Sequence, residues 1–433
     1  MRKAVILLII FTVLSRLCFW FLLYPNVTFT ADSQGYLDLA RLIQDFNLNG
    51  YLGYRSIGYP FLIFLAGSKL YIVVLYQCLL GILTTLVWFK ILCLLKFTTK
   101  QSIAISLFFS TLLNVLVFET SILVETLTLF LLSFIIYLII KKGLNHQSLR
   151  YNLQLSVLFG LLTLVKPFYA FLPFLYFGIY ILNTFKLNKY LFYKSTIIIG
   201  SLISYFGWSY ANQLNTGHFV STTFFGLNTA QNCVRFAEKV PEEYDWIAKP
   251  YAAAREEMKT NNEDISMAIW KAYESGAIKT NDLSFPDFSK QLGDYARVAI
   301  KENPNDYLHQ VVFYSFRDFW RTSIYWEDSK FSSALAKTIS TSLWFVQQHI
   351  LKLFRILFLL CSVLLCLQFF KLKKITIPLA LTLTVMAAAI LQALVTYGTN
   401  ARFSFPFEFI MVIVVLHTLK ALKNRYLTKR AML

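Results

Sequence analysis

The residues of this sequence that could do chemistry are charged side chains within or at the ends of long apolar segments. A charged group at membrane depth is costly, so such residues are functional candidates. The candidates are Asp32, Glu119, Glu125, Lys166, Lys352, Arg355, Arg402 and Glu408 at predicted outer ends, with Arg16 deeper in the first segment. Carboxylates beside cations suit one task in particular. A carboxylate takes a proton from an acceptor hydroxyl, while Lys or Arg stabilises a lipid phosphate as it departs.

The two leading acidic candidates also have structural explanations. Asp32 stands where an N-cap is expected, before a helical pattern, and Asp is among the best N-cap residues. A capping carboxylate stays ionised, so it can still act as a base. Glu125 could instead pair with Lys166 or Arg16.

The basic candidates have structural explanations as well. Arg402 lies at a predicted helix start, where a cation opposes the helix dipole unless it meets an anion, and this favours phosphate binding. Lys166 precedes a proline in a turn and could simply extend its ammonium group to the membrane interface. Lys352 and Arg355 lie about one turn apart at the start of an apolar segment, where contact with lipid head groups is the simpler role.

The composition shows what kind of chain must position these residues. Of its 433 residues, 57% are hydrophobic and 15% are charged, with a mean hydropathy of +0.56. Because soluble globular proteins are about one quarter charged, an ordinary cytoplasmic enzyme is excluded. The 17% aromatic content also excludes a disordered or fibrous chain. We expect an all-α, polytopic membrane protein.

The distribution of the +18 formal net charge argues against nucleic-acid binding. The stretches that carry basic residues without an acidic one are 2–3, 96–100, 141–150, 186–194, 371–374 and 420–430. Each is short and lies beside apolar runs, which is the positive-inside pattern of cytoplasmic loops. The pattern predicts that both termini are cytoplasmic.

A bilayer core of ~30 Å needs ~20 apolar residues per helix, and this length predicts about ten transmembrane helices. Their expected ranges are 3–24, 70–95, 102–119, 121–140, 153–166, 168–185, 192–211, 351–370, 375–396 and 404–422. The division within 153–185 is open. The chain then has a transmembrane module (1–211) with an external loop (25–69), an extracytoplasmic domain (212–350) and C-terminal transmembrane helices (351–433).

The external segments have helical patterns of their own. In 32–46, apolar residues recur on one helical face, which predicts an amphipathic helix on the outer membrane surface. The apolar stretch 56–67 is too short to cross, so we expect it to lie in the interface or re-enter. Segments 264–276 and 286–304 predict a small helical domain resting on the membrane.

The cysteines and histidines predict neither a disulfide framework nor a metal site. Of the six cysteines, only Cys233 lies in the large polar segment. The five histidines are scattered without the spacing of metal ligands.

Five short segments fall in order at predicted outer ends of helices: TADSQGYLDLARLI (30–43), YRSIGYPFLIFLAG (54–67), ETSILVETLTLFLL (119–132), LVKPFYAFLPFLYF (164–177) and YGTNARFSFPFEFI (397–410). In this order they resemble motifs of the GT-C glycosyltransferases, integral-membrane enzymes that use polyprenyl-phosphate-linked sugars. The similar group within that superfamily is the protein O-mannosyltransferases and the aminoarabinose transferases of lipid A. The resemblance covers the chain from residue 1 to about 425.

The sequence also departs from that family. Its external domain precedes the last spans, whereas better-known members carry theirs after the final span. Thr399 and Asn400 stand where an acidic residue often precedes the late arginine. There is no Asp-x-Asp motif, so the metal-dependent branch of oligosaccharyltransferase type is not supported.

The resemblance implies an inverting glycosyltransferase in the bacterial cytoplasmic (inner) membrane, with its active site facing outside. Asp32 would be the catalytic base, with Glu125 as a second catalytic acidic residue. The donor phosphate would be bound by Arg402, Lys166, Lys352 and Arg355. The partners would be a polyprenyl-phosphate sugar, an extracytoplasmic lipid, glycan or protein acceptor, and membrane lipids. No cofactor is expected, and the use of a divalent metal ion stays open.

Two other functions fit the composition. A transporter or flippase of envelope lipids would place its charges near mid-membrane, often in two related halves. Here the charges concentrate at the predicted outer surface, and no internal repeat is visible. A polymerase or ligase acting on a lipid-diphosphate glycan is compatible with the large external segment, but the motif order does not favour it.

Overall fold

The computed structural model describes residues 2–184, 189–280 and 283–431. Within these ranges every regular element is a helix, apart from one isolated bridge between Thr28 and Ser121. The expectation of an all-helical chain is therefore confirmed for the described residues.

The first half of the chain forms a helical bundle. Its helices are α1 (Arg2–Cys18), α2 (Ser33–Gln44), α3 (Gly58–Leu65), α4 (Leu70–Leu94), α5 (Thr99–Ser110), α6 (Leu113–Thr120), α7 (Glu125–Lys142), α8 (Leu149–Val165), α9 (Phe171–Thr184), α10 (Lys189–Ser195) and α11 (Ile199–Thr216). Short turns of other helix types adjoin them: η1 (Phe19–Leu23), η2 (Pro167–Ala170) and η3 (Thr196–Ile198). The amphipathic helix predicted in the first external loop is α2, and the short apolar stretch forms α3.

A smaller helical domain follows the bundle. It contains α12 (Phe225–Gln231), α13 (Asp245–Thr260), α14 (Ala268–Glu274), α15 (Phe285–Glu302) and α16 (Pro304–Gln310), with the short turns η4 (Val234–Phe236), η5 (Glu242–Tyr244) and η6 (Ile265–Met267). These helices bury a hydrophobic cluster of their own, separate from that of the bundle, and Cys233 and Tyr295 lie within it. The two helical segments predicted in this region correspond to α14 and α15.

The remaining elements return to the bundle. They are η7 (Val311–Ser315), α17 (Phe316–Phe319), η8 (Asp328–Lys330), α18 (Ala334–Leu372), α19 (Ile377–Val395), α20 (Asn400–Ser404), η9 (Phe405–Phe407) and α21 (Glu408–Ala431). The span predicted to begin at residue 351 is part of α18, which begins earlier, at Ala334. The Ser333 side chain caps this helix by accepting a hydrogen bond from the Ala336 N–H. In the main core, the rings of Trp88 and Phe409 stack 4.3 Å apart and join α4 to α21.

Among the described residues, six helices are long and apolar enough to cross a membrane: Arg2–Leu23, Leu70–Leu94, Pro167–Thr184, Ala334–Leu372, Ile377–Val395 and Asn400–Asn424. A seventh span is obtained if α5 and α6 are taken together. The span predicted over 102–119 corresponds to this pair, whose two helices are bent by 53°. The three other predicted spans, 121–140, 153–166 and 192–211, only overlap α7, α8 and α11, and the last also includes η3. Helix α7 contains three charged residues, and α8 has 17 residues.

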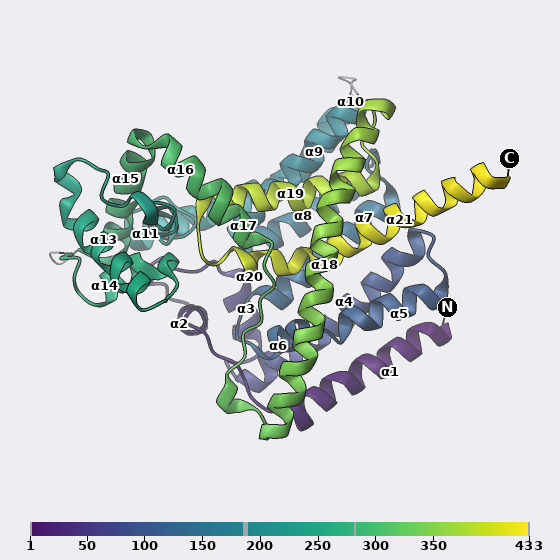
Figure 1. The fold of residues 1–433 in the computed structure, drawn as a ribbon, viewed down its shortest axis with the longest axis horizontal. Helices are drawn as coiled ribbons and strands as arrows, with labels where there is room; N and C mark the ends of the chain where they lie inside the picture. Colours follow the sequence, from purple (N-terminus) through teal and green to yellow (C-terminus); the bar gives the residue numbers. More distant parts are fainter. Residues whose placement is uncertain (1, 185–188, 281–282, 432–433) are drawn as a thin grey trace.

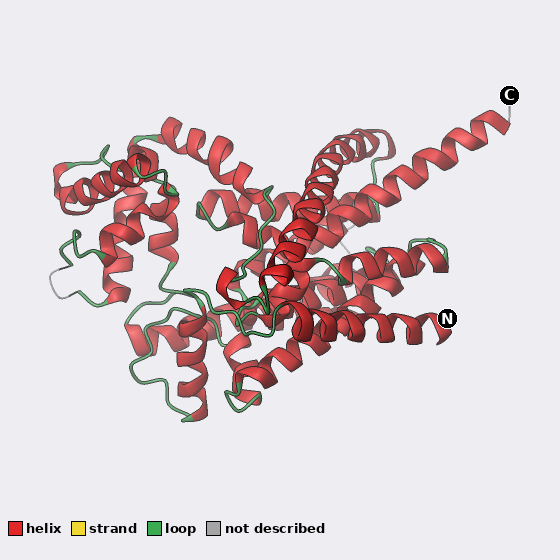
Figure 2. Cartoon of the chain, turned by 60° about the horizontal axis from the view of Figure 1, so that its bottom comes forward, coloured by secondary structure: helices red, strands yellow, loops and turns green. Residues whose placement is uncertain are grey.

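The small domain and the two termini lie at opposite ends of the molecule. Figure 1 shows both termini at one end of the bundle and α13–α15 beyond the other end. Figure 2 shows that many of the loops gather between the bundle and the small domain. Helices α2, α3 and α20 lie near this region (Figure 1).

Candidate functional site

Five charged side chains from separate segments form one connected cluster. Asp32 lies just before α2, Arg55 in the loop before α3, and Glu125 at the first position of α7. Lys166 lies between α8 and η2, and Arg402 lies in α20. Four of these five are sequence candidates, and the structure brings all four together.

Asp32 bridges two arginines. Its Oδ1 accepts a hydrogen bond from Arg55 Nη2 at 2.6 Å, and its Oδ2 accepts one from Arg402 Nη2. The carboxylate makes no capping hydrogen bond to α2. The helix-cap explanation of Asp32 is therefore wrong, and both carboxylate oxygens are committed to the cluster.

The position of Asp32 relative to Glu125 is fixed by the backbone. The Thr28 N–H donates to the Thr120 carbonyl at 2.9 Å, and the Ile122 N–H donates to the Thr28 carbonyl at 3.0 Å. The Ser33 hydroxyl adds a hydrogen bond of 3.0 Å to the Ile122 carbonyl. The segment that precedes α2 is thus held against the segment that precedes α7.

Glu125 is the second acid of the cluster. Its side chain is 1% exposed, and its Oε1 lies 3.1 Å from Arg402 Nε and 3.6 Å from Lys166 Nζ. Neither carboxylate oxygen is in hydrogen-bond geometry with a described group. The predicted pairing with Lys166 is confirmed, whereas Arg16 pairs with Glu119 instead, at 2.6 Å. A carboxylate at the N-terminus of α7 is also stabilised by the helix dipole.

Aromatic rings support the cations. The Arg55 guanidinium lies 4.9 Å from the centre of the Tyr36 ring and 4.8 Å from that of Phe224. The Lys166 ammonium lies 3.3 Å from the centre of the Phe403 ring. Cation–π contacts of this kind stabilise desolvated charges, so the cations are held without full pairing to carboxylates.

The electrostatics of the cluster keep Asp32 ionised. Burial by itself raises the pKa of Asp32, but the charges and hydrogen bonds of Arg402 and Arg55 outweigh burial and hold the pKa well below its usual value. With Arg55, Lys166 and Arg402 against Asp32 and Glu125, the formal charge of the five is +1. The cluster therefore suits an anionic ligand.

The other predicted phosphate-binding residues lie elsewhere. Arg355 is buried and donates to Glu408, to the carbonyls of Phe319 and Arg321, and to the Ser404 hydroxyl. Lys352 is exposed on α18. Among the described residues, no ion pair or hydrogen bond joins either side chain directly to the five-residue cluster.

Arg55 is the one residue of the cluster that the sequence candidates omit. It lies inside the quoted segment 54–67, but in a loop without periodic pattern. Its position is set by Tyr51, whose hydroxyl hydrogen-bonds both the N–H and the carbonyl of Arg55. The composition of the loop 25–69 could have identified Arg55 as a candidate. The loop has few basic residues, and several tyrosines lie near Arg55 in the sequence.

Within the described ranges, no group of three or more His, Cys, Asp or Glu side chains is arranged to hold a metal ion. No protein-family model matches the chain, and no curated protein matches its sequence significantly. The fold and the apolar helices define a helical membrane protein. Its most distinctive site is a cluster of three cations and two carboxylates at the end of the bundle that faces the small domain.

Proposed function

We propose that this chain is an inverting membrane glycosyltransferase that moves a sugar from a polyprenyl-phosphate donor to an acceptor hydroxyl. The observation that supports the proposal is the meeting of Asp32, Glu125, Lys166 and Arg402 in one cluster, with Arg55 as a further cation. Cations that surround a departing phosphate and a carboxylate that accepts a proton are what this reaction requires.

In the proposed reaction, the acceptor oxygen attacks the anomeric carbon and its proton passes to Asp32. The bond between that carbon and the phosphate oxygen breaks, and the phosphate departs with the bonding electrons. Arg402 and Lys166 stabilise the phosphate, whose negative charge grows in the transition state. Glu125 holds both cations in place, since it lies within 3.6 Å of each.

The ion pairs of the cluster give the donor a second role. A donor phosphate that binds Arg402 competes with Asp32 for that guanidinium. Because Arg402 and Arg55 hold the pKa of Asp32 down, loss of one partner raises that pKa toward its usual range. Donor binding then makes Asp32 a stronger base at the time when a base is needed.

The proposal includes the topology that the charge pattern predicts. About ten helices cross the bacterial cytoplasmic membrane, with α7, α8 and α11 among the spans, and both termini are cytoplasmic. The cluster and the small domain then face outside. The acceptor is a lipid, a cell-envelope glycan or a protein that approaches from that side.

The test is a transfer assay with the full chain in liposomes, using a synthetic polyprenyl-phosphate sugar and mass spectrometry of its products. We expect release of polyprenyl phosphate by the wild type and loss of release in Asp32→Asn and Arg402→Ala. Asp38→Asn is a matched control, because Asp38 lies in α2, the helix that Asp32 precedes, and its side chain is 53% exposed. Failure of every polyprenyl-phosphate sugar tested against total envelope extract would contradict the proposal.

A transporter or flippase is the second candidate, and one observation favours it. Arg16 and Glu119 form a buried ion pair within the bundle, where ionisable residues mark transport pathways. Lipid-linked glycan that crosses the liposome membrane without any transfer, and that stops crossing in Glu119→Gln, would support this function instead.

A further inference from the structure

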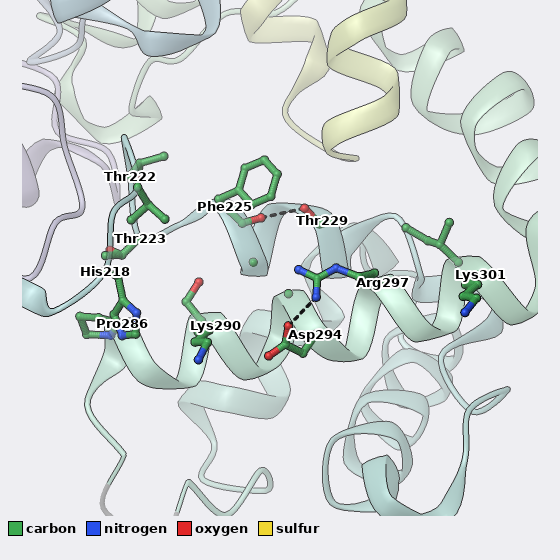
Figure 3. Close-up of a pocket in the computed structure, with 15 residues that line it drawn as sticks. His218, Thr222, Thr223, Phe225, Thr229, Pro286, Lys290, Asp294, Arg297 and Lys301 are labelled. Carbon is green, nitrogen blue, oxygen red and sulfur yellow. Dashed lines mark hydrogen bonds and ion pairs between the residues drawn. The ribbon is translucent and has the colours of Figure 1, made fainter. Parts of the chain in front are cut away.

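The small domain contains a groove that is separate from the charged cluster. The groove encloses about 700 Å³ and is lined by the loop after α11, by α12 and by α15 (Figure 3). Small residues line it where α12 and α15 meet. A Cβ on Gly226 would lie 1.7 Å from the Ser289 carbonyl oxygen, so glycine is required for the two backbones to approach this closely.

One face of α15 gives the groove a positive charge. Lys290, Arg297 and Lys301 line it, together with the carboxylate of Asp294. Asp294 accepts a hydrogen bond of 2.9 Å from Arg297, and Figure 3 shows this guanidinium between α15 and α12. Lys290 and Lys301 are exposed and form no ion pair with a residue that the structure describes. Three cations against one carboxylate favour an anionic ligand.

The groove also contains an unsatisfied hydroxyl. Ser289 is 2% exposed, and its Oγ has no hydrogen-bond partner among the described residues. Buried polar atoms are nearly always paired. A ligand oxygen in the groove would provide an acceptor for this hydroxyl.

An apolar surface leads to the groove. One face of α11 exposes four large side chains, spaced as neighbours on a helix and 68%, 50%, 57% and 69% exposed: Ile203, Phe206, Tyr210 and Leu214. Phe219, in the loop that leads from α11 to α12, stacks on Phe206 with ring centres 6.2 Å apart. The apolar face therefore continues to the point where His218 and Val220 line the groove.

We propose that the groove binds the head group of an anionic phospholipid, whose acyl chains lie along the exposed face of α11. The cations and the Ser289 hydroxyl would contact the phosphate, and the apolar face would contact the chains. A soluble anion would use only the first of these features. The charged groove and the apolar face of α11 together therefore favour a lipid. Lipid binding requires no transfer reaction, so this inference stands or fails separately from the proposed function.

The groove adjoins the loop that carries Arg55. The Thr223 N–H donates to the Gly53 carbonyl at 2.9 Å, and the Thr222 hydroxyl donates to the Tyr54 carbonyl at 3.0 Å. Phe224, the next residue after Thr223, contacts the Arg55 guanidinium with its ring. A bound lipid would thus hold the small domain on the membrane beside the charged cluster.

The test uses the full chain, delipidated in detergent, with phosphatidylglycerol or phosphatidylcholine of identical acyl chains as probes and native mass spectrometry to count bound lipids. The variant is Lys290→Gln with Lys301→Gln, both on an exposed surface. The matched control is Lys249→Gln with Lys279→Gln, two exposed lysines of the same domain that do not line the groove. sn-Glycerol 3-phosphate serves as a head group without chains.

We expect the wild type to prefer phosphatidylglycerol, and each groove lysine removed to weaken binding about fivefold, the equivalent of about 1 kcal/mol for each basic residue near an anionic surface. The control variant should keep the wild-type preference. An unchanged preference in the groove variant, or equal binding of both lipids by the wild type, would overturn the proposal. Glycerol phosphate that binds as tightly as the lipid would overturn the role of the chains.

Discussion

Asp32 and Arg402 lie 370 positions apart in the sequence, and their side chains form a direct ion pair. The second oxygen of the same carboxylate binds Arg55. One side chain therefore joins the segment before α2, the loop before α3 and the short helix α20. In the proposed reaction, the donor phosphate would compete with Asp32 for Arg402.

This exchange predicts opposite effects of one substitution on binding and on catalysis. Asp32→Asn removes the anion that competes for Arg402 and Arg55, so the proposed donor should bind more tightly. Loss of the base should lower kcat by about 100-fold or more. Donor affinity and single-turnover transfer, measured on the same reconstituted sample, check both effects. Weaker donor binding in Asp32→Asn would contradict the exchange.

The lowered pKa of Asp32 predicts how stability depends on pH. Because the folded state holds this pKa below the ordinary value of about 3.9, the stabilisation is complete above that value and is lost as the pH falls below it. The difference in Tm between wild type and Asp32→Asn should be constant from about pH 8 to 5 and shrink below about pH 4. Thermal unfolding in detergent at several pH values measures it. A difference that grows on acidification would refute the assignment.

The buried pair of Arg16 and Glu119 predicts a strict requirement for glycine on α4. A Cβ at Gly81 would lie 1.8 Å from Glu119 Oε1 and 2.9 Å from Arg16 Nη2. Gly81→Ala should separate the pair and cost about 3–5 kcal/mol, the usual effect of leaving a buried charge unpaired. Gly207→Ala on α11 is the control, because its Cβ meets no atom within 4 Å. Thermal stability in detergent distinguishes Gly81→Ala from Gly207→Ala. Equal stability of these two variants would show that the Arg16–Glu119 ion pair tolerates displacement.

Arg355 is predicted to stabilise the fold without binding the donor phosphate. Its guanidinium is committed to Glu408, to two backbone carbonyls and to Ser404, while Asn114 donates to the other Glu408 oxygen at 2.8 Å. Arg355→Gln and Glu408→Gln should both lower Tm and leave the donor KM near the wild-type value. Lys352→Gln should leave Tm unchanged because Lys352 is exposed. A raised donor KM in Lys352→Gln alone would restore the predicted phosphate role of that lysine.

The sequence predicted the positions of the apolar helices because their lengths are set by burial and hydrophobic patterning. It also predicted Asp32, Glu125, Lys166 and Arg402 as candidate site residues, because charges beside apolar segments are rare. The early start of α18 was missed. Residues 334–350 mix polar and apolar side chains, so hydropathy alone does not mark them as part of a membrane helix.

The sequence left the pairing of the charges open, because it offers both Lys166 and Arg16 as partners of Glu125. Arg16 was considered as a partner of Glu125, but the bend between α5 and α6 brings Glu119 to it instead. Arg55 was omitted because a loop has no periodicity that points its side chains in a predictable direction. Both outcomes depend on tertiary contacts between segments that are distant in sequence, and such contacts leave no local pattern.

The separation of Asp32 from Arg402 also has a consequence for biosynthesis. A ribosome delivers Asp32, Arg55, Glu125 and Lys166 early, and these four side chains have a formal charge of zero together. Arg402 follows only after the small domain and the long helix α18 have been made. Its arrival raises the charge to +1 and gives Asp32 its second partner. A nascent chain thus gains the cluster's net positive charge only after every helix before α20 has been synthesised.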